Sequence, residues 1–388
     1  EYGEFTILIS VVVLIQSIFL FGFEHSLNYY FNKFRSSIGK KILVSTQLLF
    51  ILLTYFLTFV PISLLLSGKV EYVNLILFWG FIAVLIAYFG TLLRVDMLVS
   101  IFIKSQILQS VVLLVAVYLF VVVYQLSLQG ALYANIFSMT MSVMYIFFSI
   151  KKYLIFNFNI KLFKKVLHYG LPLMPAGIML WASMQLDRYY ILFFLDEYLL
   201  GIYGFSLSIA MIPLLLKAAF KNAIDPFIMK AFHREALKTK KYISSYFTLS
   251  LFIFGFLFLF LSIFAHEIVL LVGGLKYLES IPYIPWLLLI ASITTLNQYF
   301  VYGLNFTKTN KLILRGLIYM LIINVILAYV LIGIFNIYGV ILANLIANIS
   351  YTIYLYKKSN ELYPIEHNFS MNVTIVISVL GGGILNYF

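Results

Sequence analysis

Long apolar stretches separated by short polar loops recur along the whole chain. Each is near the roughly 20 residues that cross a bilayer as a helix. The stretches are residues 5–23, 42–66, 73–93, 107–124, 131–150, 171–195, 200–220, 246–265, 281–305, 312–332, 338–355 and 371–387. This pattern predicts an all-α, polytopic transmembrane helix bundle with about twelve spans. The composition, 63% hydrophobic and 10% charged residues, excludes a water-soluble domain.

The positive charges follow the same pattern, because nearly all of the 26 Lys and Arg residues fall on every second loop. Only Lys69 and Lys276 lie in the intervening loops, and Arg188 lies within an apolar stretch. By the positive-inside rule the basic loops face the cytoplasm. We therefore expect a multi-pass protein of the cytoplasmic membrane. Its net charge of +12 then reflects topology and contact with membrane lipids, and nucleic acid is not an expected partner.

The chain is expected to have two pseudo-symmetric halves of six helices each. A weak echo between Gly3-Glu4-Phe5 and Gly201-Ile202-Tyr203, each opening an inward-running span, favours a parallel duplication. The expected parts are an N-terminal bundle (1–150), a cytoplasmic basic amphipathic linker (151–170), a C-terminal bundle (171–356), and a cytoplasmic loop with an extra terminal span (357–388).

The linker and the first span carry further expectations. Ile160, Phe163 and Leu167 fall on one helical face and lysines on the other, which predicts a short helix on the inner leaflet. Because the loop after the first span is basic, that span enters from outside. We therefore expect at least one helix to precede Glu1.

Several kinds of chemistry are excluded by what the sequence lacks. It has no cysteine, and its five histidines show no pair at metal-ligand spacing. It has no phosphate-binding glycine loop. The loops are too short for a catalytic domain. We expect no metal, no cofactor and no enzyme activity.

Charged residues at membrane depth are the main functional candidates, since a charge in hydrocarbon costs at least about 2.5–3.5 kcal/mol and needs a partner or water. Asp187 and Arg188 lie in the outer part of the stretch 171–195. They could form a structural ion pair or face a cavity. Glu24 closes the first span and could be a protonatable group of a cytoplasmic vestibule or a snorkelling side chain.

A second group of candidates lies near the inner ends of the spans. Lys217, Lys221 and Asp225 recur at four-residue spacing on one helical face. The two lysines could meet a phosphate or snorkel to anionic lipid, and Asp225 could pair with Lys221. Arg94 and Arg315 lie at the inner rim. Together with Arg188, these residues would line a cationic cavity, while Asp187, Glu24 and Asp225 would serve ion coupling or gating.

The chain resembles a known family over essentially its whole length, most specifically within residues 169–227 and elsewhere mainly in its hydropathy pattern. The runs are Tyr-Gly-Leu-Pro-Leu-Met-Pro (169–175), Gln-Leu-Asp-Arg-Tyr-Tyr-Ile-Leu (185–192), Gly-Ile-Tyr (201–203) and Asp-Pro-Phe (225–227). They resemble the start of the second half of the polysaccharide flippases, the O-antigen and capsule type exporters of the multidrug/oligosaccharidyl-lipid/polysaccharide superfamily. The opening residues 1–5 resemble the family's first loop, which puts one helix before Glu1. Residues 357–364 resemble the fourteen-helix members, which puts another beyond Phe388.

The resemblance implies a function and its partners. Such a flippase moves a polyprenyl-pyrophosphate-linked oligosaccharide from the inner to the outer leaflet by alternating access, driven by a Na⁺ or H⁺ gradient, and works beside other glycan assembly proteins. Asp187-Arg188 fits the family pattern, whereas Lys217 and Lys221 are less typical of it. The alternatives are a multidrug or other small-molecule antiporter of the same superfamily, a lipid-linked glycan polymerase or transferase, and a structural scaffold.

Overall fold

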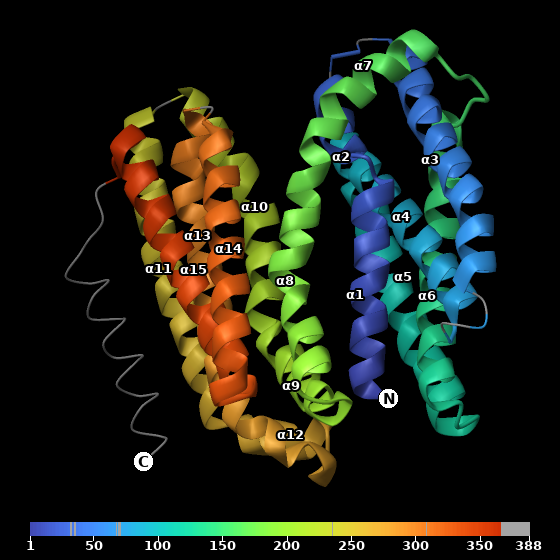
Figure 1. Ribbon diagram of the computed structural model, residues 1–388. Coiled ribbons are helices and arrows are strands. Elements are labelled where there is room, and N and C mark those ends of the chain that lie inside the picture. The colour runs from blue at the N-terminus through green and yellow to red at the C-terminus, as the bar shows by residue number, and fades with distance from the viewer. Residues whose placement is uncertain are drawn as a thin grey trace. The chain divides into compact units, whose positions relative to one another are not determined.

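The computed structural model describes residues 1–31, 33–34, 36–66, 68, 71–234, 236–307 and 309–365, which form helices and turns without a β-strand (Figure 1). The α-helices are α1 (Tyr2–Phe19), α2 (Phe23–Phe31), α3 (Ser37–Leu66), α4 (Val73–Val95), α5 (Val99–Val117), α6 (Ser127–Ile150), α7 (Ile160–Gly170), α8 (Met174–Phe194), α9 (Glu197–Ala210), α10 (Ile212–Arg234), α11 (Ala236–Ile263), α12 (Ala265–Val272), α13 (Ile284–Phe306), α14 (Asn310–Phe335) and α15 (Ile337–Leu362). A π-helical turn (Tyr118–Val123) and three 3-10 segments (Lys151–Tyr153, Leu171–Leu173 and Leu275–Tyr283) complete the helical structure.

Among the described residues, ten helical segments are long and apolar enough to cross a membrane. They correspond to ten of the twelve predicted stretches and confirm an all-α, multi-pass membrane protein. The sixth stretch, 171–195, is not among the ten; it forms α8, whose polar residues Gln185, Asp187 and Arg188 lower its hydropathy. The twelfth, 371–387, lies outside the described residues, as does most of the expected part 357–388.

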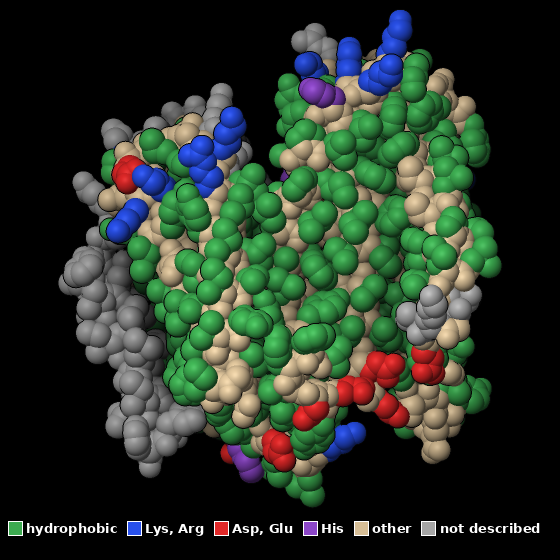
Figure 2. Space-filling view, in the orientation of Figure 1, with side chains coloured by type: hydrophobic (Ala, Val, Ile, Leu, Met, Phe, Trp, Pro, Cys, Tyr) green, Lys and Arg blue, Asp and Glu red, His purple; other side chains and the backbone are tan. Residues whose placement is uncertain are grey.

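Contacts divide the described chain into two compact units, an N-terminal unit that extends to Gln185 and a C-terminal unit that begins at Leu186. In each unit the charges are segregated along the helices. On the face shown in Figure 2, Lys and Arg side chains gather mainly at one end of each unit, and Asp and Glu side chains mainly at the other. This is the segregation that the alternating basic loops predict.

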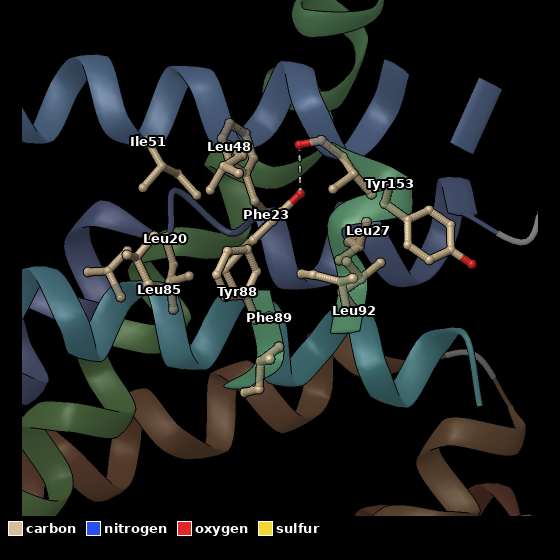
Figure 3. Packing of buried hydrophobic residues seen from close by; sticks show 14 of the residues in the cluster. Leu20, Phe23, Leu27, Leu48, Ile51, Leu85, Tyr88, Phe89, Leu92 and Tyr153 are labelled. Atoms are coloured by element: carbon tan, nitrogen blue, oxygen red, sulfur yellow. Dashed lines mark hydrogen bonds between the residues drawn. The ribbon is translucent and has the colours of Figure 1, made fainter. Parts of the chain in front are cut away.

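The core of the N-terminal unit is built from α2, α3, α4 and the end of α6. Tyr88 on α4 is fully buried there and lies with Phe23, Leu48 and Ile51 (Figure 3). Its hydroxyl donates to the Val44 carbonyl oxygen at 3.2 Å, so the phenol is both packed and hydrogen-bonded.

A close backbone contact fixes the corner between α1 and α2. The first span was predicted over 5–23, but α1 ends at Phe19 and the chain turns through Gly22, whose φ is +66°. A Cβ atom on Gly22 would lie 2.1 Å from the carbonyl oxygen of Gly170 at the end of α7. Only glycine permits both the positive φ and this approach, so the α1–α2 corner and the α7–α8 corner are held together.

The predicted amphipathic linker helix is α7, and it crosses the end of the N-terminal unit (Figure 1). Val166 is fully buried, and Phe163 packs on Phe50 of α3 with ring centroids 4.6 Å apart. Lys161 and Lys165 on the other face are exposed. The apolar face of α7 therefore packs largely on its own unit. Its place on the inner leaflet stays a prediction.

In the C-terminal unit α13 packs against α11, α9 and α15, and α14 and α15 form a long antiparallel pair (Figure 1). The turn between α14 and α15 contains Asn336 with a φ of +51°. Just after it, Gly339 lets α15 begin against α14, since a Cβ there would lie 2.2 Å from the Leu331 carbonyl oxygen. This packing brings polar residues of α8, α9, α10, α13 and α15 together.

Candidate functional site

Asp187 and Arg188 are held inside the C-terminal unit by α8. Their exposed fractions are 4% and 6%, so both charges are removed from the surface of the unit. Burial of an ionisable group in a membrane protein requires partners that replace its hydration. The contacts of Asp187 show which residues supply them.

One carboxylate oxygen of Asp187 accepts two hydrogen bonds. The Tyr203 hydroxyl on α9 donates to Oδ2 at 2.7 Å, and the Asn344 side-chain amide on α15 donates to the same oxygen at 2.6 Å. The other oxygen, Oδ1, is buried and has no hydrogen-bond partner among the described residues. A buried carboxylate oxygen in this state can accept a proton or a small hard cation.

The hydrogen bonds continue from Asp187 along α15 to α13. Asn348 lies one turn beyond Asn344, and its amide donates to the Asn344 side-chain oxygen at 2.5 Å. Thr294 on α13 donates from its hydroxyl to the side-chain oxygen of Asn348 at 3.2 Å. The two asparagines thus extend the polar contacts of Asp187 to a third helix.

Lys217 on α10 joins the other end of this series. Its ammonium group donates to the backbone carbonyl oxygen of Thr294 at 2.8 Å. Asp187, Tyr203, Asn344, Asn348, Thr294 and Lys217, which we call the polar network, therefore link five helices of the unit. The network carries an acid near one end and a base at the other.

The remaining C-terminal candidates lie outside the polar network. Lys221, one turn beyond Lys217, is half-buried, and Arg315 on α14 is exposed. Asp225 lies in α10, and its side chain is outside the described residues. Of the lysine pair proposed to meet a phosphate, Lys217 is the one that the structure connects to Asp187.

Glu24 and Arg94 belong to the N-terminal unit. Glu24 lies in the first turn of α2, after the first membrane-spanning helix, and is half-buried. Burial raises the pKa of its carboxyl group, and the positive charges of His25 and Arg94 partly oppose this rise. Arg94 is exposed at the end of α4, where it donates to the Thr91 hydroxyl at 3.0 Å.

Four members of the polar network were not among the predicted site residues: Tyr203, Thr294, Asn344 and Asn348. Asn344 and Asn348 did leave a signal, because two amides four residues apart in an apolar stretch share one helical face. Tyr203 and Thr294 resemble the many other Tyr and Thr residues of the chain. Only the packing of their helices distinguishes them.

The fold defines the class of protein, a multi-pass transmembrane helix bundle. It is similar to a multidrug resistance MATE family transporter of the MOP superfamily in an inward-facing conformation, with a TM-score of 0.74 at 15% identity over 93% of this chain and 89% of that one. It is also similar to the lipid II flippase MurJ in an inward closed conformation, with a TM-score of 0.73 at 15% identity over 100% of this chain and 86% of that one. At such identities the likeness shows the fold alone.

The sequence shows the family. The profile of a family described as polysaccharide biosynthesis protein matches residues 1–282. The chain belongs to this polysaccharide biosynthesis family, which confirms the resemblance noted in the sequence. No curated protein sequence matches it.

Proposed function

We propose that this protein moves a polyprenyl-pyrophosphate-linked oligosaccharide from the inner to the outer leaflet of the cytoplasmic membrane for surface polysaccharide synthesis. The two bundles alternate access to the substrate, and a Na⁺ or H⁺ gradient drives the cycle. Its family and its transporter fold support this proposal and favour transport over polymerisation or transfer of glycan. Other proteins of glycan assembly supply the substrate.

The observation that carries the proposal is the burial of basic groups at membrane depth in the C-terminal unit. Arg188 is 6% exposed, and the Lys217 ammonium group is bound to the Thr294 carbonyl oxygen inside the bundle. A pyrophosphate diester carries about two negative charges, so its passage requires cations or water within the bundle. Arg188, whose guanidinium can bind two phosphate oxygens, is our first candidate. Lys217, Lys221, Arg94 and Arg315 are the other proposed contacts.

Asp187 is the proposed coupling residue. Its Oδ2 is fixed by Tyr203 and Asn344, whereas its buried Oδ1 has no hydrogen-bond partner in the described part of the chain. Binding of a proton or Na⁺ there would neutralise the acid and change its attraction for nearby cations. Glu24 and Asp225 are secondary candidates for gating.

The test is export of surface glycan in a host whose own flippase is deleted. The wild-type gene should restore surface polysaccharide, Arg188→Ala should abolish it, and Arg188→Lys should retain part of it because the charge is kept. Lys311→Ala is the control, since Lys311 is an exposed base of the same unit. Each variant is checked for membrane insertion at the wild-type level. Full export by Arg188→Ala would contradict the proposed role of Arg188.

A multidrug antiporter is the second candidate, because a multidrug resistance transporter shares the fold. The same strains distinguish the two functions. If the wild-type gene restores no glycan but lowers the accumulation of a cationic dye, the antiporter should replace the flippase as the proposed function.

A further inference from the structure

A surface cavity of about 280 Å³ opens on the N-terminal unit where α3 and α7 begin. Lys161 and Lys165, four residues apart on one face of α7, line it together with Gly39 of α3. Both lysine side chains are exposed. The volume is many times the roughly 10–15 Å³ that one water molecule requires, so the cavity can hold a larger polar group.

The electrostatics of this cavity favour an anion. Just before α3 the Ser36 hydroxyl oxygen accepts from the Gly39 backbone amide at 3.0 Å, and just before α7 the Asn159 side-chain oxygen accepts from the Leu162 backbone amide at 2.9 Å. The positive ends of two helix dipoles therefore lie beside the two lysines. No Asp or Glu is present among the described lining residues.

Hydrogen bonds join the segment that leads into α7 to α3. The backbone amide of Asn159 donates to the buried Thr46 hydroxyl of α3 at 3.2 Å. The backbone amide of Ile155 donates to the buried Ser45 hydroxyl of α3 at 2.9 Å. The distance between the lysine-bearing helix and the start of α3 is thus set by the fold. A cavity with fixed walls binds an anion with less loss of entropy than loose surface lysines do.

The surroundings of the cavity are apolar, as a lipid site requires. Phe34, Ile42 and Leu162 line it beside the lysines. Phe156, ahead of α7, and Ile160, the first residue of α7, expose 102% and 55% of their surface. Exposed apolar side chains next to basic ones are typical of segments at the boundary between headgroups and acyl chains. A soluble anion would not need this apolar rim.

We propose that this cavity binds the phosphate headgroup of an anionic phospholipid, with Lys161 and Lys165 on the phosphate and the acyl chains beside Ile42 and Leu162. A bound lipid would fix α7 at the inner surface of the membrane. This site lies wholly in the N-terminal unit and is separate from the polar network. It does not depend on which substrate the protein moves.

The test is lipid binding by the purified full chain in detergent, measured by native mass spectrometry during titration with phosphatidylglycerol or phosphatidylcholine. The wild type should retain one phosphatidylglycerol in preference to phosphatidylcholine. The double variant K161Q/K165Q should bind it about thirtyfold more weakly, from roughly one tenfold step per 1.4 kcal/mol and about 1 kcal/mol for each lysine near an anionic lipid. The matched control is K151Q/K164Q, which removes two exposed lysines that do not line the cavity.

Three outcomes would overturn the proposal. Equal weakening by the two double variants would mean diffuse attraction by the basic surface. Equal retention of the two lipids by the wild type would mean that the cavity does not distinguish an anionic headgroup from a zwitterionic one. Displacement of phosphatidylglycerol by an equal concentration of inorganic phosphate would show a site for free phosphate. Retention of phosphatidylglycerol against such phosphate, lost only in K161Q/K165Q, supports the lipid site.

Discussion

At the scale of single residues, the two oxygens of Asp187 have different environments. Oδ2 is bound by Tyr203 and Asn344, while Oδ1 is buried without a hydrogen-bond partner in the described part of the chain. A carboxylate buried in this way is destabilising unless it is neutralised for part of the time. The asymmetry therefore fits a group that gains and loses a cation during a transport cycle.

Replacing Asp187 by Asn tests this role, because the amide keeps the size of the side chain and removes its charge. Asp187→Asn should abolish gradient-driven glycan export while membrane insertion stays at the wild-type level, because the Asn side-chain oxygen can still accept from Tyr203 and Asn344. Export by the wild type should fall when an ionophore collapses either the Na⁺ or the proton gradient, and the effective ionophore identifies the ion.

Asp196→Asn is the matched control for this change. Asp196 is exposed and caps α9 by accepting from the Leu199 amide at 2.7 Å, a role that Asn fills equally well. Its variant should export like the wild type. Export by Asp187→Asn that still responds to the gradient would remove Asp187 from the coupling mechanism.

At the scale of elements, the pairing of α14 with α15 depends on how closely their backbones approach. A Cβ at Gly339 would lie 2.2 Å from the Leu331 carbonyl oxygen, whereas a Cβ at Gly333 has open space around it. The obstacle at Gly339 is backbone, so no side chain can rotate away. Since α15 carries Asn344 and Asn348, a shift at its start also disturbs the polar network.

Two Gly→Ala variants measure this effect. Gly339→Ala should destabilise the protein by about 1–3 kcal/mol, the usual cost of overpacking, and lower its unfolding temperature in detergent. Gly333→Ala, six residues earlier in α14, should leave stability unchanged or raise it, because alanine favours a helix more than glycine does. Equal effects of the two variants would mean that the approach at Gly339 does not limit the pairing.

Local irregularities in the helices were harder to predict than the helices themselves. The amphipathic helix α7 was predicted within its segment, because lysines and apolar residues alternate with helical period. The π-helical turn at Tyr118–Val123 was not predicted, since no Gly or Pro marks it in the stretch 107–124. In hydrocarbon an apolar run specifies a helix but not its exact hydrogen-bond pattern.

At the scale of the whole molecule, the spans could be predicted because each is a local property of about 20 residues. The sequence also showed that Asp187 and Arg188 interrupt an apolar stretch, and the structure shows that both side chains are buried. Their surroundings could not be predicted. Tyr203 and Asn344 are 16 and 157 residues from Asp187, and only helix packing brings them to the same oxygen.

Orientation in the membrane is the property of the whole molecule on which the proposed direction of transport depends. The chain has no cysteine, so a single introduced Cys reports its own position with a membrane-impermeant maleimide. In intact cells Tyr124→Cys and Glu197→Cys should be labelled, because these exposed residues lie in or next to inter-helix loops that carry few basic side chains. Lys152→Cys and Lys311→Cys should be labelled only after the cells are permeabilised, since positive loops stay in the cytoplasm. The reverse labelling would place the cavity beside α7 at the outer leaflet and would invert the proposed direction of glycan movement.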